Sequence, residues 1–69
     1  MTTDTLAEAL PRKQARVRAL IPIYREIGPP GAFALMMMER SLQAADQAAA
    51  SGDVVAMLRA LEDLRGYSA

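Results

Sequence analysis

Apolar side chains recur every three or four residues over most of the chain, which is the pattern of helices that bury one side. Within residues 31–51 their spacing is three, four, three and four: Leu35, Met38, Leu42, Ala45 and Ala49. A second helical stripe lies within residues 54–65: Val54, Met57, Leu58, Leu61 and Leu64. The two stripes predict two helices whose apolar sides face each other.

A three-residue segment, Ser51 to Asp53, separates the two stripes and is expected to reverse the chain. Gly52 tolerates the left-handed backbone that ends a helix, and Asp53 can accept a hydrogen bond from the first turn of the next one. A connection this short folds the second helix back on the first. We therefore predict an all-α fold built on an antiparallel hairpin of residues 31–51 and 54–65, with Gly66 ending the second helix.

A third helix is predicted before the hairpin, over residues 11–27. Its broad apolar face can cover the open side of the hairpin: Val17, Leu20, Ile21, Tyr24 and Ile27. Pro11 suits a first turn, so we place the start there, after a separate short turn capped by Thr5. Pro22 removes one backbone hydrogen bond and is expected to kink the helix. The sequence Gly-Pro-Pro-Gly at residues 28–31 ends it, and Pro30 can begin the next helix.

The composition predicts one small domain, residues 1–69, with frayed ends at residues 1–4 and 67–69. Of 36 hydrophobic residues 14 are Ala, and there is one Phe and no Trp. Such a core is thin for a chain below about 70–80 residues, where one core rarely supplies more than about 3–5 kcal/mol. The chain has no Cys for a disulfide and no His for a structural zinc site, so we expect no metal. A homodimer is the expected source of further stability, and a marginal monomeric bundle is the alternative.

Acidic and basic residues cancel, eight against eight, but four basic residues gather in the first helix: Arg12, Lys13, Arg16 and Arg18. They allow an alternative function, a small DNA-binding regulator that attracts phosphates. A helix-turn-helix would place residues 54–65 in the major groove, and this segment carries two acids against two arginines. We therefore expect a solvated face or a docking patch for an acidic protein, and no nucleic acid.

The sequence favours neither a membrane protein nor an enzyme. It has no apolar run of about 18–20 residues, and the N-terminus lacks the basic start and apolar core of a signal peptide. These features predict a cytoplasmic location. Without His or Cys the usual general base and thiol nucleophile are missing, and no glycine-rich phosphate loop is present. We expect no catalytic residues and no cofactor.

One flank of the predicted helix 31–51 carries residue types that are common at protein interfaces: Phe33, Met36, Met37 and Arg40. Methionine adapts to a partner's shape, and arginine is enriched at interfaces. We predict these four residues, with Arg16 and Tyr24 of the first helix, as partner-binding residues. The sequence leaves open whether the partner is a second copy, a different protein, or each on its own face. Alternatively, the third helix covers these side chains and they have no binding role.

Two stretches carry a resemblance to a known family: RKQARVRALIPIYREIGPPGAF and ASGDVVAMLRALEDLRGYS. With the length of 69 residues, they resemble the small early-region proteins of Mu-like Pseudomonas phages, and among them the quorum-sensing anti-activators. The resemblance implies an all-helical, dimeric binding protein in the host bacterial cytoplasm. Its implied targets are the DNA-binding domain of the transcription factor LasR and PilB, the ATPase of the type IV pilus. Binding would suppress quorum sensing and superinfection.

No contact residue is carried over from the resemblance, because no motif matches position by position. The basic DNA-reading surface of a transcription factor suggests charge complementarity with the acids of the hairpin: Glu39, Asp46, Glu62 and Asp63. A structural or assembly protein of a mobile element, which binds itself and little else, is a further alternative.

Overall fold

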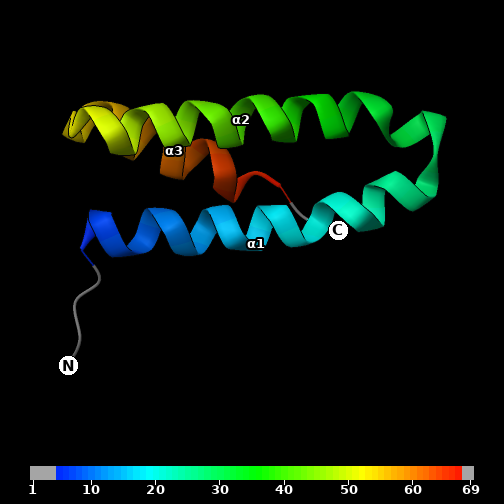
Figure 1. The fold of residues 1–69 in the computed structure, drawn as a ribbon, viewed down its shortest axis with the longest axis horizontal. Helices are drawn as coiled ribbons and strands as arrows, with labels where there is room; N and C mark the ends of the chain where they lie inside the picture. The colour runs from blue at the N-terminus through cyan, green and yellow to red at the C-terminus, as the bar shows by residue number, and fades with distance from the viewer. Residues whose placement is uncertain (1–4, 68–69) are drawn as a thin grey trace.

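The computed structural model describes residues 5–67, and within them the chain is all-α, as predicted. Helix α1 (Leu6–Ile27) is followed by a short 3₁₀ helix η1 (Pro29–Gly31), then by α2 (Ala32–Ser51) and α3 (Val54–Arg65). α1 and α2 run antiparallel along the length of the molecule, and α3 turns back beside them (Figure 1). No strand is present among residues 5–67.

The predicted hairpin is confirmed, and its bounds agree with α2 and α3 to within one residue. Gly52 has a φ of 71° and donates its N–H to the carbonyl of Ala48 at 3.2 Å, which ends α2. One carboxylate oxygen of Asp53 accepts from the N–H groups of Val55 at 3.0 Å and Ala56 at 3.3 Å. These bonds satisfy donors that the first turn of α3 would otherwise leave unpaired.

Helix α1 begins at Leu6, earlier than the predicted start at residue 11. The hydroxyl of Thr5 caps it by accepting from the N–H of Glu8 at 3.2 Å, so the predicted separate turn is the first turn of α1. Pro11 therefore lies inside the helix, and Leu10 beside it is fully buried. Burial of this side chain offsets the one backbone bond that the proline removes. α1 also continues across Pro22, and its last turns lean toward α2 (Figure 1).

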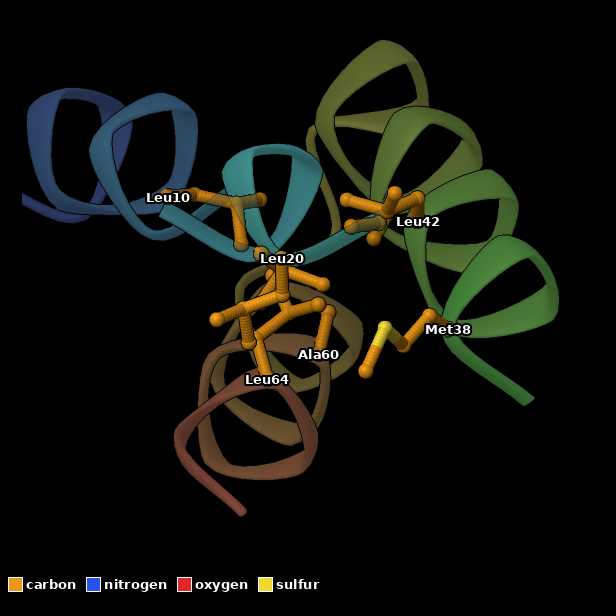
Figure 2. Close-up of a cluster of buried hydrophobic side chains, with 9 residues drawn as sticks. Leu10, Leu20, Met38, Leu42, Ala60 and Leu64 are labelled. Atoms are coloured by element: carbon orange, nitrogen blue, oxygen red, sulfur yellow. The ribbon is translucent and has the colours of Figure 1, made fainter. Parts of the chain in front are cut away.

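The core lies where the three helices meet (Figure 2). It contains Leu10, Val17, Leu20, Met38, Leu42, Ala45, Ala48, Ala60 and Leu64. The predicted stripes are wrong at their edges, because Val54, Leu58 and Ala49 are exposed. For Val54 and Leu58 the reason is that α3 packs against two helices at once, so its buried side is centred on Ala60 and Leu64 and not on a two-helix seam. Ile27, predicted in the core face of α1, is also exposed.

The connection between α1 and α2 is tightly packed. Gly28 has a φ of 83°, which ends α1, and both prolines lie in η1 before α2 begins at Ala32. Gly31 is buried against α1, and a Cβ atom at this position would lie 2.6 Å from the backbone oxygen of Tyr24. Only glycine therefore fits here without a shift of the backbone.

Helix α3 is much shorter than the two helices it packs against. It has 12 residues against 22 in α1 and 20 in α2, which correspond to about 18, 33 and 30 Å at the α-helical rise. Consequently α3 covers the half of the α1–α2 pair next to the Ser51–Asp53 turn and leaves the other end uncovered (Figure 1).

Tyr67 follows α3 and belongs to the packed structure. Its hydroxyl lies 2.8 Å from the hydroxyl of Ser41, and its ring packs against the core. It is thus an additional contact and not part of a frayed end. The rest of the predicted frayed ends, residues 1–4 and 68–69, lie outside the described residues.

Candidate protein-binding surface

Four large apolar side chains are exposed on the turns of α1 and α2 next to η1, at the uncovered end of the bundle. Ile23 and Ile27 come from the last turns of α1, and Phe33 and Met36 come from the first turns of α2. Phe33 has the largest exposed fraction, 69%. Single exposed apolar residues are ordinary, but several on adjoining turns are typical of an interaction site. We call these four residues the apolar end.

The residues of the apolar end do not all face the same way, as the surroundings of α2 show. Met37 and Asp63 line the same hollow between α2 and α3. Phe33 lies one helical turn before Met37 on the same side of α2, so it borders the place that further turns of α3 would fill. Met36 instead lies on the exposed side of α2 together with Gln43. Arg40 is exposed too, but it lines the same hollow as Met37 and Asp63.

The structure brings most of the predicted partner-binding residues together. Phe33, Met36, Met37 and Arg40 lie on consecutive turns of α2, with Met37 half-buried and the other three exposed. Tyr24 is on the adjoining part of α1, half-buried and packed against the core. Ile23 and Ile27 were missed, since the sequence alone did not show that α3 ends before it reaches them.

Arg16 lies apart from this group. Its guanidinium Nη2 donates to the backbone oxygen of Leu64 at 3.1 Å, near the end of α3. The last carbonyls of a helix lack partners within the helix and carry partial negative charge, so a cation is favoured there. This bond ties α1 to α3 and gives Arg16 a structural contact.

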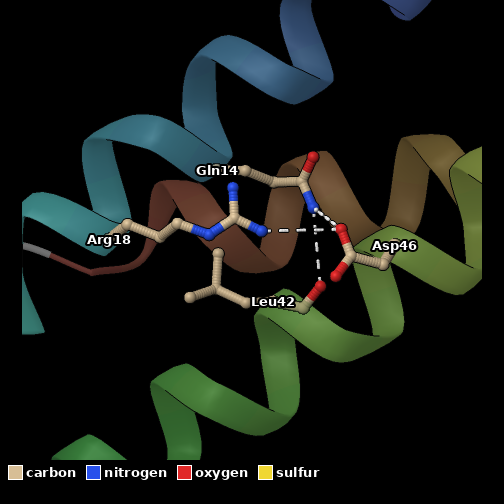
Figure 3. Close-up of polar contacts among 4 residues, drawn as sticks. All are labelled: Gln14, Arg18, Leu42 and Asp46. Atoms are coloured by element: carbon tan, nitrogen blue, oxygen red, sulfur yellow. Dashed lines mark hydrogen bonds and ion pairs between the residues drawn. The ribbon is translucent and has the colours of Figure 1, made fainter.

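A polar cluster joins α1 to α2 in the middle of the bundle (Figure 3). The side-chain amide of buried Gln14 donates to Asp46 at 2.7 Å and approaches the carbonyl of Leu42 at 3.5 Å. The guanidinium of Arg18 lies 3.6 Å from the same oxygen of Asp46. Gln14 was missed as a buried residue, although its spacing of four from Leu10 and three from Val17 places it on the buried side of α1.

The acids of the hairpin do not form one face, contrary to the charge-complementarity hypothesis. Asp46 is engaged by α1, as described above, and Glu62 pairs with Arg65 at 3.5 Å. Asp63 lies elsewhere, beside the hollows between α2 and α3. Asp46 and Asp63 lie on these different sides, so the four acids do not form a single acidic patch.

The basic residues of α1 are divided in a similar way. Arg18 points toward Asp46 of α2, whereas Arg16 points toward the end of α3. Arg12, Lys13 and Arg16 line a hollow of about 270 Å³ on the second of these sides. The four predicted phosphate-binding residues therefore do not share one surface.

A larger hollow of about 530 Å³ lies between α2 and α3 and has mostly small side chains in its lining: Ala44, Gln47, Ala48, Ser51, Ala56, Arg59, Ala60 and Asp63. Within residues 5–67, no group of three or more acidic residues is placed to hold a metal ion. None of the helices in this described part of the chain is both long and apolar enough to cross a bilayer.

Comparisons of the chain with protein-family models, with curated proteins and with solved structures find no match.

Proposed function

We propose that this protein works by stoichiometric binding to another protein and has no catalytic activity. The observation that carries the proposal is the apolar end, where Phe33 and three other large apolar side chains are exposed on adjoining turns. Exposing such a patch to water is unfavourable, and burial against a partner removes it from water.

The resemblance supplies the identity of the proposed targets. They are the DNA-binding domain of LasR and the pilus ATPase PilB, both in the cytoplasm of an infected Pseudomonas cell. By occupying them, a phage-encoded inhibitor would suppress quorum sensing and superinfection. Two exposed residues of α2 support such binding. Met36 offers adaptable apolar surface, and Arg40, beside the hollow between α2 and α3, offers a guanidinium that can pair with a carboxylate.

The test is a binding titration of the purified protein against the purified LasR domain and against PilB. We expect Met36→Glu to weaken binding at least tenfold, because it places a charge in the apolar contact. The matched control is Gln43→Glu, which introduces the same side chain about two turns further along the exposed side of α2. Arg40→Glu should weaken binding in the same way as Met36→Glu.

The outcomes of these titrations test the contact residues and the identity of the targets separately. Binding that survives both Met36→Glu and Arg40→Glu would refute Met36 and Arg40 as contact residues. Absence of binding to LasR and to PilB by the folded wild-type protein would refute the proposed targets.

A further inference from the structure

A groove runs along the outer side of the α2–α3 hairpin. It consists of the hollow of about 530 Å³ between these helices and a second hollow of about 280 Å³, and both hollows have Ala44 and Asp63 in their linings. Every described residue that lines either hollow belongs to α2 or α3. Viewed along their axes, the three helices form a triangle (Figure 2), so the groove faces away from α1. We call it the hairpin groove.

The hairpin groove has dimensions that suit a helix. On α2 its lining extends from Met37 to Ser51, which is about 21 Å at the α-helical rise and matches a helix of about 14 residues. Ala48 and Ala60 in the lining are small and buried, so a docked helix can approach closely. The backbone groups in the middle of α2 and α3 bond within each helix, so an extended peptide finds no edge with which to pair.

Larger apolar side chains lie at the two ends of the hairpin groove. Met37 is half-buried and lines the end nearer η1. Val55 is near the other end, one turn before Arg59 on the same side of α3, and has an exposed fraction of 57%. An apolar partner that covers Met37 and Val55 removes their surface from water, which is favourable.

Charged side chains on both rims of the hairpin groove are available to a partner. Arg40 belongs to the α2 rim, and Arg59 and Asp63 belong to the α3 rim. None of these three side chains forms a hydrogen bond or an ion pair with another described residue. By contrast, Arg16 is bonded to a backbone oxygen and Arg18 is paired with a carboxylate. The rims carry two positive charges and one negative charge, which favours a partner with an excess of acidic side chains.

We propose that the hairpin groove binds one amphipathic helix of a different protein, whose apolar side covers the groove and whose carboxylates on both flanks pair with Arg40 and Arg59. Carboxylates suit these positions because they form paired, charge-assisted hydrogen bonds with guanidinium groups. A second copy of this chain fits less well, because the exposed apolar turns of its α3 carry Arg59, which would meet like charges on the rims. The groove shares Arg40 with the contact proposed for LasR and PilB, but its occupant does not depend on either being a target.

A pair of synthetic peptides tests the charge requirement. The probe is a fluorescently labelled helical peptide of about 18 residues, with leucine and alanine on one side and glutamate on both flanks. The matched peptide has lysine in place of each glutamate. We expect the wild-type protein to bind the glutamate peptide about tenfold more tightly than the lysine peptide. Arg59→Glu should reverse this preference, because it reverses the net charge of the rims.

Two control variants separate the hairpin groove from other surfaces. Arg25→Glu makes the same change of charge at an exposed arginine of α1, outside the groove, and should leave the preference unchanged. Met36→Glu should also leave it unchanged, because Met36 does not line the groove. Arg59 is exposed, so retained helical circular dichroism should confirm that Arg59→Glu folds.

Disulfide trapping locates the bound peptide, since the chain has no Cys of its own. A glutamate peptide with one central cysteine should cross-link to Gln47→Cys, which lines the groove, and not to Gln43→Cys, one turn earlier on the exposed side of α2. The reason is that a disulfide requires Cα atoms within about 7 Å.

Three outcomes would overturn the proposal. The first is that the folded wild type binds neither peptide or binds both equally. The second is that Gln43→Cys cross-links as readily as Gln47→Cys. The third is that Gln47→Cys cross-links to itself in place of the peptide, which would assign the groove to a second copy of the chain. Neither LasR nor PilB is added, so failure here is distinct from failure to bind them.

Discussion

Gly31 offers the sharpest test of the packing between α1 and α2. In the variant Gly31→Ala, the new Cβ atom would lie 2.6 Å from the backbone oxygen of Tyr24 and 3.4 Å from the Cβ atom of Ile27. The first distance is below the 3.0 Å limit that real Cβ contacts respect. The neighbour is backbone, so it cannot move away without shifting the last turns of α1.

The expected change in the free energy of unfolding follows from two opposing effects. Overpacking of this kind costs about 1–3 kcal/mol. Replacement of Gly by Ala at an allowed backbone conformation restricts the unfolded chain and returns about 0.4–1 kcal/mol. The φ of Gly31 is −87°, which alanine adopts freely. The loss of stability therefore comes only from the contact between the new Cβ atom and the backbone oxygen of Tyr24. We expect a net loss of about 1–2 kcal/mol, a large part of the stability of so small a domain.

The assay is urea unfolding followed by helical circular dichroism, with all variants at one protein concentration because association shifts apparent stability. Gly66→Ala is the matched control, since Gly66 has a φ of −73° and its nearest neighbour is at 3.4 Å. The control should be neutral or slightly more stable than the wild type. Equal stability of Gly31→Ala and Gly66→Ala would refute the tight contact between Gly31 and Tyr24.

Three further predictions concern polar contacts, each measured by the same unfolding assay. Asp53→Ala removes the acceptor for two N–H groups of α3 and should cost about 1 kcal/mol, whereas Asp53→Asn should retain most of the stability; equal losses would contradict the cap. Asp46→Ala leaves the buried amide of Gln14 without its 2.7 Å partner and should cost about 1–3 kcal/mol, more than Asp46→Asn. Tyr67→Phe removes the partner of the Ser41 hydroxyl and should cost about 0.5–1.5 kcal/mol, and an unchanged unfolding midpoint would exclude a contribution from this bond.

The parts of the fold that local signals determine were predictable. The turn at Gly52 and the cap at Asp53 act within a few residues, so the bounds of α2 and α3 followed from the sequence. The start of α1 did not follow from the sequence. Pro11 favours a helix start, and the effect that opposes it is burial of Leu10 against helices that are distant in the sequence. Local rules give no information on that burial.

The candidate surface was predictable only in the part that one helix contributes. The spacing of Phe33, Met36 and Arg40 placed them along one flank of α2 without knowledge of the other helices. Exposure of Ile27 depends on where α3 ends relative to α1, which is a tertiary property. The contact of Arg16 joins residues 48 positions apart in the sequence, and no periodicity indicates it.

The distribution of the aromatic residues has a consequence for optical spectroscopy. The chain has one Phe, two Tyr and no Trp, and these three residues lie between the middle of the bundle and the apolar end. Tyrosine fluorescence and near-ultraviolet circular dichroism therefore observe only this half of the molecule. A ligand that docks at the apolar end should change the tyrosine signal without any added label, whereas opening of the turn at Gly52 should leave it unaltered.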